Sequence, residues 1–525
     1  MLTSHSELVT TFINNITEVE MARTSVQILL ALLLITVDFV QCKNILVLMG
    51  VGSPSHHLWN GVLINSLASK GHNLTILTVD VPKGSKVHPN LHYIHLEETY
   101  RHREKVIHFD DLINANLLQE IPNFYQFGYS TCQGILQSKG LGILLDYPDS
   151  THFDLVLYEY SSGPCLLGFL HKFNYPPLVA ITAFHNPPYT GDLVGSHIYP
   201  AYIPFFSLGY DVNMSFWERF YNTIIYIADA LYRIHVYTPS LDRLVRPHFA
   251  KDLPYVGDLD KKTVLVLVNS HPATNYPEPL PPNIIEVGGM QLVESQPLPP
   301  DLEEFINKSD KGAILISLGT NMKSDTLGPE RSKIFIDAMS QLPEYNFIWK
   351  FDNNFNNTHL KLPKNRLKAF FTHAGGLSIQ EATWYGVPLI GMNLHKCVEH
   401  GVAEMIDYKN LSSDVLRDTI KKVTTEPKYS QNMKLRSKRF RDRPMSALDT
   451  AIWWIEYVLR NPNPTHLQSP AQELGFFRAN CLDIYAFIVA ISLASIWIFF
   501  KMCCFLYKRK IIIKKKCLIC HDKKE

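Results

Sequence analysis

Apolar runs alternate with helical spacing over most of the chain, beginning with a strand, a helix and a strand. Residues 44–50 form an apolar run that predicts a buried strand, and residues 56–70 show helical spacing that ends at Gly71. Residues 74–79 return to the strand pattern. Three such elements in a short stretch predict the first unit of a doubly wound parallel sheet.

The same alternation continues through the first half of the chain. Residues 153–158 and 178–182 predict further strands, with a helix at 165–171 between them. Residues 216–237 predict an amphipathic helix inside a stretch rich in aromatic residues and prolines. A segment of this kind either covers a pocket or packs on the sheet, and the pattern favours neither.

A proline-rich segment at residues 277–300 predicts an extended linker between two domains. The alternation then starts again, with strands at 313–319 and 347–350 around a helix at 332–342. The pattern therefore predicts an α/β fold with two Rossmann-like domains. Later helices are predicted at 412–423, 431–441 and 446–460, the last two separated at Pro444.

Both ends of the chain carry membrane-protein patterns. Residues 1–42 predict a polar leader and a signal peptide that starts at Met21 and is cleaved near Cys42. Residues 484–507 are apolar and long enough for a transmembrane helix, and residues 508–525 form a basic tail. We expect a type I single-pass membrane protein with its bulk in the lumen. Its lumenal parts would be an N-terminal domain at 43–276, the linker, a C-terminal domain at 301–462 and a juxtamembrane segment at 463–483.

Composition adds few constraints on function. The 525 residues are 46% hydrophobic, enough for two cores, and a net charge of +1 gives no reason to expect a nucleic-acid partner. Nine cysteines show no spacing typical of a disulfide framework, and Cys132 with Cys165 is the one lumenal pair we consider. Potential glycosylation sequons begin at Asn73, Asn213, Asn307, Asn356 and Asn410.

The stretch from Phe370 to Gly391 carries the most specific chemical pattern. A short apolar strand runs into small residues at 374–376 and then into a helix. Free backbone N–H groups and the dipole at a helix N-terminus favour a bound phosphate. His373 would donate to that phosphate and Glu381 would accept from ribose hydroxyls. A Gly-Gly turn alone is also typical of an ordinary βαβ connection.

The longer pattern is more specific than the turn. Thr372-His373-x-Gly375, then Glu381, then Gly386-x-Pro388 resembles the signature of the UDP-glycosyltransferase superfamily, and most closely its membrane-bound animal branch of UDP-glucuronosyltransferases and insect UDP-glucosyltransferases. The resemblance implies a GT-B-like fold, two Rossmann-like domains facing across a cleft. It implies transfer of glucose or glucuronic acid from a UDP-sugar donor to a hydroxyl of a small lipophilic acceptor, in the endoplasmic reticulum membrane. It also implies no metal and no cofactor besides this co-substrate, and leaves homo- or hetero-oligomers possible.

The resemblance also implies roles for individual residues. His56 falls where the family keeps its general base, and Glu159 falls where a carboxylate orients that base. His57 and Asp154 are the competing candidates for these two roles. The UDP-sugar would be held by Gly319 and Thr320 after the second domain's first strand, and by His373, Gly375, Gly376, Ser378 and Glu381.

Two family elements are missing from the donor-binding half. The Trp-x-Pro-Gln element that holds the uracil has no counterpart before Leu367, and Cys397 and Val398 stand where the family has the Asp-Gln pair for the sugar hydroxyls. Neither of these two side chains accepts a hydroxyl as Asp does. Two short deletions, at 364–366 and 392–401, would explain the pattern. The alternative function is therefore a catalytically impaired isoform that acts as a membrane partner of intact family members.

Overall fold

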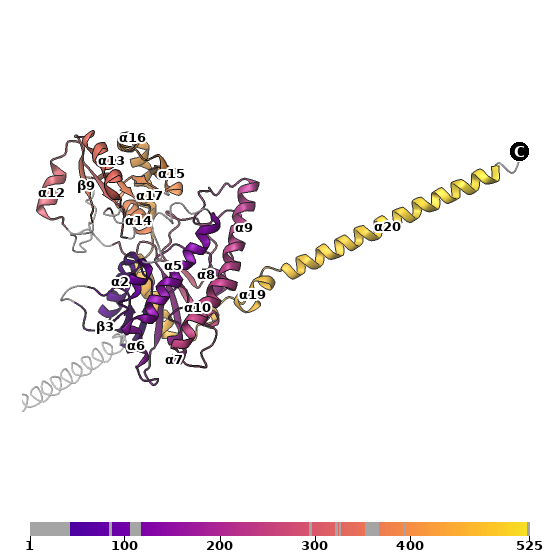
Figure 1. The fold of residues 1–525 in the computed structure, drawn as a ribbon, viewed down its shortest axis with the longest axis horizontal. Coiled ribbons are helices and arrows are strands. Elements are labelled where there is room, and N and C mark those ends of the chain that lie inside the picture. Colours follow the sequence, from indigo (N-terminus) through magenta and orange to yellow (C-terminus); the bar gives the residue numbers. More distant parts are fainter. Residues whose placement is uncertain are drawn as a thin grey trace, which may run out of the picture.

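The computed structural model describes residues 42–82, 87–104, 117–292, 297–320, 324, 327–351, 367–392 and 394–521. The predicted signal peptide, the Asn356 sequon and the first of the two deletion points lie outside the described residues. Two parallel sheets, each covered by helices, form the globular part, and one long helix leaves it (Figure 1). The predicted α/β fold class with two Rossmann-like sheets is confirmed.

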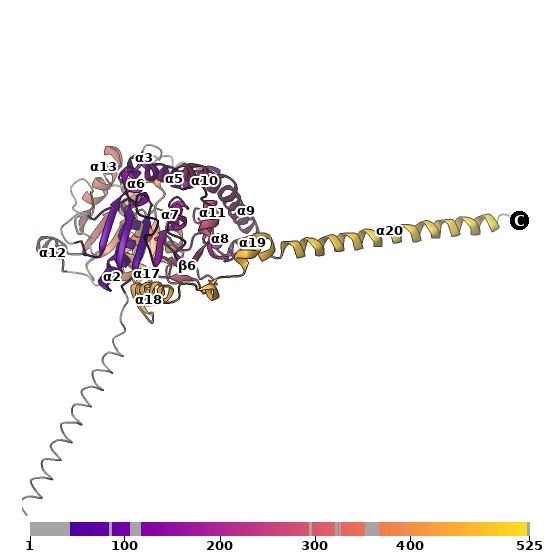
Figure 2. The same ribbon diagram turned by 90° about the horizontal axis from the view of Figure 1, so that it is seen from below.

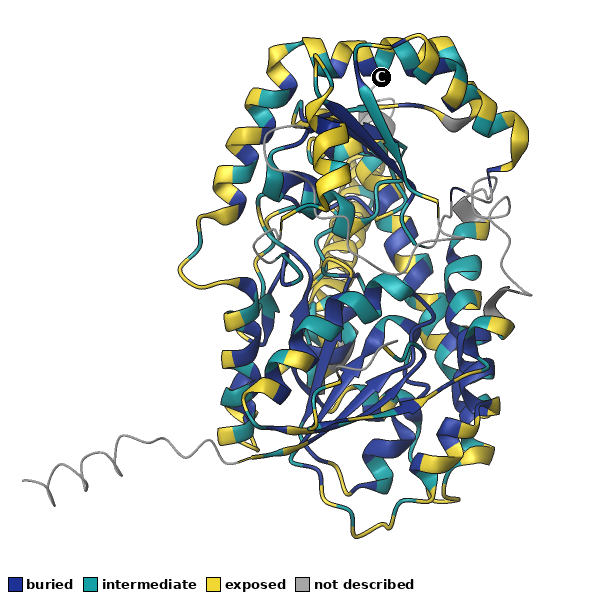
Figure 3. Ribbon diagram, turned by 90° about the vertical axis from the view of Figure 1, so that its left-hand side faces the viewer, coloured by how far each residue is buried: buried dark blue, intermediate teal, exposed yellow. Residues whose placement is uncertain are grey.

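The N-terminal sheet has seven parallel strands in the order β3-β2-β1-β4-β5-β6-β7. The four central strands β1, β4, β5 and β6 are buried apolar runs because helices cover both faces of the sheet (Figure 3). The strands are β1 Asn44–Met49, β2 Asn73–Thr78, β3 Leu91–His95, β4 Leu155–Glu159, β5 Leu178–Thr182, β6 Thr263–Val268 and β7 Ile284–Glu286.

The helices of this half lie on the two faces of the sheet (Figure 2). One hydrophobic cluster joins the sheet to α5, and the other joins it to α2. The helices are α2 Pro54–Ser69, α3 Thr99–Glu104, α5 Leu117–Gln137, α6 Lys139–Leu145, α7 Gly168–Lys172, α8 Thr190–Val194, α9 Phe216–Tyr232, α10 Thr238–Val245 and α11 Val256–Asp260. Short helices of other types are η1 Tyr160–Ser162, the π-helix η2 Arg233–Tyr237 and η3 Arg246–His248.

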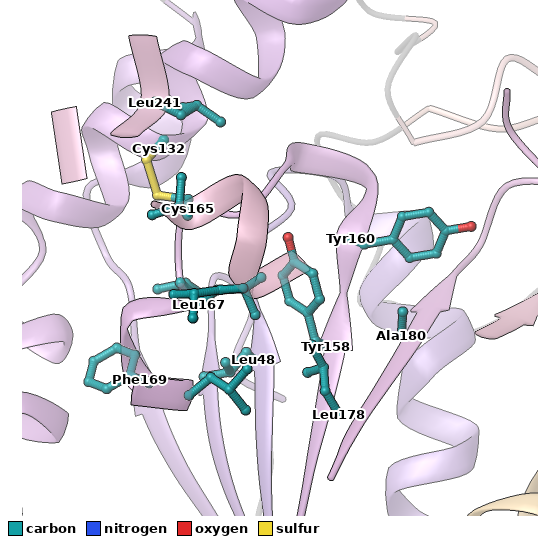
Figure 4. Packing of buried hydrophobic residues seen from close by; sticks show 14 of the residues in the cluster. Leu48, Cys132, Tyr158, Tyr160, Cys165, Leu167, Phe169, Leu178, Ala180 and Leu241 are labelled. Atoms are coloured by element: carbon teal, nitrogen blue, oxygen red, sulfur yellow. A yellow bond between two sulfur atoms is a disulfide. The ribbon is translucent and has the colours of Figure 1, made fainter. Parts of the chain in front are cut away.

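A disulfide joins Cys132 on α5 to Cys165, just after η1. It lies inside the first hydrophobic cluster, among Leu48, Leu167 and Phe169 (Figure 4). The pairing considered from the sequence is therefore present, and it fixes α5 to the loop that follows β4.

The C-terminal sheet has five parallel strands in the order β12-β11-β10-β8-β9. The strands are β8 Ala313–Ser317, β9 Asn346–Trp349, β10 Leu367–Thr372, β11 Leu389–Gly391 and β12 Ala403–Met405. Its helices are α12 Pro300–Asn307, α13 Gly328–Ser340, α14 Gly376–Tyr385, α15 His395–Glu399, α16 Ser413–Thr425 and α17 Pro427–Arg441, with the 3-10 turn η5 Tyr408–Asn410.

The segment at 277–300 is not only a linker. Ile284–Glu286 forms β7, which pairs with β6 at the edge of the N-terminal sheet. The prolines flank this strand rather than interrupt it, which is why a three-residue strand fits between them. The linker interpretation therefore needs correction at these residues.

The chain returns to the N-terminal half after α17. Helix α18, Ala447–Arg460, packs Ala451 and Ile455 into the hydrophobic cluster that contains α2. The turn η6 Thr465–Leu467 and helix α19 Ala471–Ala479 follow, and then helix α20 Leu482–His521. The segment 482–513 of α20 is long and apolar enough to cross a membrane. Its apolar window has a mean hydropathy of 2.1, and none of the residues in that window is buried.

Candidate active site

The N-terminal sheet changes winding direction between β1 and β4, since β2 and β3 lie on one side of that pair and β5 to β7 on the other. Ligands of doubly wound sheets bind beyond the carboxyl ends of the strands at such a switch point. His56 follows β1, in the first turn of α2, and Glu159 is the last residue of β4. The fold therefore brings these two residues to the position where a site is expected.

His56 and Glu159 contact each other directly. His56 Nδ1 lies 3.2 Å from Glu159 Oε2, and both side chains are buried. A Glu159 carboxylate can only accept, so Nδ1 carries the proton and Nε2 keeps its lone pair. Nε2 has no hydrogen-bond partner among the described residues. This nitrogen is the one available to take a proton from a substrate.

Three further groups hold the Glu159 carboxylate. Asn60 Nδ2 donates to Oε2 over 2.9 Å, and the backbone N–H and hydroxyl of Ser161 donate to Oε1 over 3.2 Å and 2.5 Å. Burial favours a higher pKa for Glu159, but the charge and hydrogen bond of His56 and the bonds from Ser161 and Asn60 outweigh it, so the pKa is lowered. Glu159 is therefore an ionised, fully bonded partner for an imidazolium.

The two competing candidates have structural contacts instead. His57 places Nε2 2.6 Å from the carbonyl of Val51 and Nδ1 3.0 Å from Thr78 Oγ1, so both its ring nitrogens are occupied. Burial lowers the pKa of His57, although the charge of Asp80 and the hydrogen bond to Val51 oppose the shift. Asp154 accepts from the Asn44 backbone and pairs with Lys43 at the amino ends of β1 and β4, opposite the site.

Sequence reasoning missed the residues that complete this group. Asn60 stands one helical turn after His56, a spacing that places both on one face of α2. Phe184, which follows β5, packs edge-on against the His56 ring at 4.7 Å between ring centroids and is partly exposed. Its ring offers an apolar surface beside the imidazole. No sequence signal marks Phe184, because the contact depends on how β5 lies beside β4.

The C-terminal sheet has its own switch point, between β8 and β10. These strands are neighbours, with β9 on one side and β11 and β12 on the other, and Thr372 is in register with Ser317. Gly319 and Thr320 follow β8, and His373 follows β10. The residues predicted to bind the nucleotide thus lie on two adjacent loops at the carboxyl ends of the strands.

The His373 ring is packed between two glycines. A Cβ on Gly319 would lie 2.3 Å from its Cε1, and a Cβ on Gly375 would lie 2.7 Å from its Nε2. Gly319 also has a φ of 88°, which favours glycine. Burial and the charge of Lys350 lower the pKa of His373 to about 4, and its Nδ1 is buried without a hydrogen-bond partner in the part of the chain that the structure describes. His373 is therefore neutral at pH 7.

Helix α14 begins next to this ring. Gly375 is its N-cap residue, Gly376 is its first residue and Ser378 lies in its first turn, where backbone N–H groups are left without helical partners. Glu381 lies further along; burial raises its pKa to about 7, although the Lys350 charge opposes the shift. Among the described residues, Thr320, Ser378 and Glu381 form no hydrogen bond with another predicted site residue.

Lys350, after β9, was not predicted from the sequence. Its charge acts on both His373 and Glu381, so it places positive potential at the β8–β10 switch point. A single lysine directly after an apolar strand is the sequence feature that could have indicated this role.

Gln380 joins the two halves of the molecule. Its side chain is buried, donates to Asn269 Oδ1 over 2.9 Å and accepts from the Gly289 backbone over 3.1 Å. Asn269 follows β6, so this contact holds the start of α14 against the N-terminal half. Arg436 adds hydrogen bonds from α17 to the carbonyls of Ala273 and Thr274.

The short connection after β11 leads directly into α15. Cys397 is buried, and its sulfur accepts from Arg436 Nη1 over 3.3 Å, while Val398 is exposed. Neither residue offers a carboxylate at the carboxyl end of β11.

The geometry defines a class of protein that has two doubly wound domains in contact. A buried His–Glu pair lies at the switch point of one domain, and the N-terminus of a helix lies beside a neutral histidine at the switch point of the other. Residues 45–517 match the family model described as UDP-glucoronosyl and UDP-glucosyl transferase. The chain belongs to this family of UDP-glycosyltransferases, enzymes that transfer a sugar from a UDP-sugar.

Relatives match over nearly the whole chain. UDP-glucosyltransferase 2 of Dactylopius coccus is 29% identical over 500 residues, covering 91% of this chain and 95% of the relative. UDP-glucuronosyltransferase 2B15 of Homo sapiens is 26% identical over 495 residues, covering 87% and 92%. The structure of the calicheamicin glycosyltransferase CalG4 aligns with a TM-score of 0.49 at 14% identity, covering 80% of this chain and 100% of that one.

Proposed function

We propose that the protein transfers a hexosyl group, glucose or glucuronic acid, from a UDP-sugar to a hydroxyl of a small lipophilic acceptor. The observation that carries the proposal is the His56–Glu159 pair, whose geometry leaves His56 Nε2 free at a switch point. Phe184, partly exposed beside the imidazole, supports an apolar acceptor.

In the proposed reaction His56 Nε2 takes the proton of the acceptor hydroxyl. The acceptor oxygen bonds to the anomeric carbon as the bond from that carbon to the diphosphate oxygen breaks, and UDP leaves. The imidazolium that forms is stabilised by the ionised Glu159 carboxylate, which also holds the ring in the required tautomer.

The diphosphate would bind at the N-terminus of α14. Backbone N–H groups of Gly375 and Gly376 and the hydroxyl of Ser378 would face it from one side, and Gly319 and Thr320 from the other. His373 would donate a hydrogen bond there, which raises its pKa once the anion is bound. Glu381 would accept from the ribose. These groups supply charge stabilisation, so the proposal includes no metal.

We also propose that α20 anchors the protein in the endoplasmic reticulum membrane as a type I protein with its bulk in the lumen. The length and composition of α20 support a membrane span. The Cys132–Cys165 disulfide supports an oxidising compartment for the folded part.

The alternative is a catalytically impaired isoform that binds intact family members. It is favoured by Cys397, which is buried against Arg436, and by Val398, because neither side chain supplies a carboxylate for the sugar hydroxyls. Loss of donor orientation would be costly, since orientation contributes about 7–11 kcal/mol in favourable cases.

One experiment separates the two. The full chain, in membranes from cells without other family members, is given radiolabelled UDP-glucose or UDP-glucuronic acid and a panel of phenols. A labelled glycoside supports the transferase and identifies its sugar. No product with either donor, together with co-purification of the chain with an intact family member that is co-expressed in a second preparation, supports the partner.

A further inference from the structure

Helix α9 carries a continuous stripe of exposed apolar side chains. They recur every three or four positions along the helix and into the π-helix η2, so they lie on one face. Trp217 is 72% exposed. The stripe consists of Phe216, Trp217, Phe220, Tyr221, Ile224, Ile227, Leu231 and Ile234.

Helix α9 differs from a helix on a soluble surface, because its outward face is apolar and its buried face also holds polar side chains. Its buried face includes Asn222 and Asp229. Asn222 accepts from the Phe205 backbone over 2.8 Å and donates to the carbonyls of Pro200 and Ile203, and Asp229 accepts from the Tyr125 hydroxyl over 2.9 Å. Two polar side chains of α9 are thus bonded inward, while the outward face, which is usually polar, carries large apolar groups.

The exposure is not that of a frayed end. Ser215 and Glu218 form a capping box at the start of α9, with Ser215 N donating to Glu218 Oε2 over 2.7 Å. Ile225 and Tyr226 are buried in the hydrophobic cluster that contains α5. The helix is therefore held in place with its apolar stripe outward.

Helix α9 lies on the side of the globular part from which α20 leaves, in both views (Figures 1 and 2). Helix α19 leads into α20 and is tied to the same side, since Gln472 donates to the carbonyl of Leu193 at the end of α8. Leu474 and Phe477 of α19 are exposed as well. The apolar segment of α20 starts only three positions after α19 ends.

We propose that the α9 stripe rests in the headgroup and acyl-chain boundary of the same bilayer that α20 crosses, so that the protein binds the membrane at two places. The inference rests on the proposed anchoring by α20. Because α20 enters the bilayer directly after α19, the bilayer surface lies next to this side of the protein. An amphipathic helix with Trp, Phe and Tyr at one end is suited to a position in the membrane interface. Exposed apolar surfaces of this size usually mark a site of contact with a membrane or a protein, and here the membrane would bury the stripe.

Site-specific photocrosslinking tests the proposal in the full chain in microsomes with radiolabelled phosphatidylcholine. Benzoylphenylalanine replaces Trp217 or Phe220, an aromatic exchange on an exposed face that leaves the fold intact. The matched control is Ile336 on α13, which is 55% exposed against 53% for Phe220 but lies away from α20. Trp497 in α20 reports separately on the span.

The expected result is labelled lipid adducts at positions 217, 220 and 497, each severalfold above position 336. Adducts at 497 with none above the control at 217 and 220 would overturn the α9 contact and leave the anchor in place. Crosslinks from 217 and 220 to a second copy or another protein, without lipid, would overturn it in favour of a protein interface. Missing adducts at 497 would overturn the α20 span, while lipid adducts at 217 and 220 would still support the α9 contact.

Discussion

The imidazole of His56 lies 3.2 Å from the carboxylate of Glu159, although 103 positions separate the two residues in the chain. The contact exists because β1 and β4 are neighbours in the sheet and both residues stand at the carboxyl ends of these strands. The pair therefore depends on the topology of the whole N-terminal half.

Glu159→Gln should lower kcat by about 10²–10⁴-fold, because an amide provides no charge for the imidazolium and no longer enforces the tautomer. Since the proposed UDP site lies in the other half, the affinity for UDP should not change. Turnover and calorimetric UDP binding check both expectations. Asp154→Asn is the control, since this carboxylate lies at the opposite ends of the same strands, and it should keep wild-type turnover. Equal losses in the two variants would argue against a specific role for Glu159.

Gly319→Ala should weaken UDP binding by about tenfold, or ~1.4 kcal/mol, since the new methyl group would displace the His373 ring. Gly328→Ala is the matched control: its φ of 77° imposes similar backbone strain, but among the described residues nothing except its own chain neighbours lies within 4 Å of the new methyl group. Both variants should lose thermal stability, and only the first should lose UDP affinity. The account of the nucleotide site fails if the two variants bind UDP equally well.

Glu381→Gln should change the pH dependence of stability. The folded pKa of Glu381 is raised to about 7, above the unfolded value of 4.5. Between these values the unfolded state ionises while the folded state stays protonated, so wild-type stability is lost as pH rises. The variant lacks this loss, and its melting temperature should rise relative to wild type between pH 4.5 and pH 7. A constant difference across that range would show that Glu381 titrates normally.

Gln380→Ala should lower the free energy of unfolding by about 1–3 kcal/mol, because it removes buried hydrogen bonds to Asn269 and Gly289. The same change at Gln431, exposed on α17, should have almost no effect. Thermal melting of the two solubilised full-length variants measures the difference. Equal melting temperatures would mean that Gln380 contributes little to the contact between the halves.

Much of the fold could be predicted because long apolar strands such as Asn44–Met49 and Ala313–Ser317 are buried on both faces. Short strands were harder. Ile284–Glu286 is flanked by prolines, and Ala403–Met405 is only partly apolar, so neither has a clear pattern of its own and each depends on its neighbour in the sheet. The exposed apolar stripe of α9 could not be predicted either, because the spacing of apolar residues does not show which face of a helix is exposed.

Only part of the candidate site could be predicted from the spacing of residues in the sequence. The turn at His373 has a local pattern, whereas Glu159 was found through the family resemblance. Asn60, Lys350 and Gln380 were missed because their roles arise from contacts between distant segments. Residues 352–366, where the sequence has no counterpart of the family's uracil-holding element, lie outside the described residues.

Replacement of His56 by alanine tests the central claim most directly. The account predicts that His56→Ala lowers kcat by about 10²–10⁴-fold with UDP affinity and the Cys132–Cys165 disulfide retained, while His57→Ala lowers thermal stability and keeps turnover. Wild-type kcat in His56→Ala, with the variant folded and UDP bound, would contradict it.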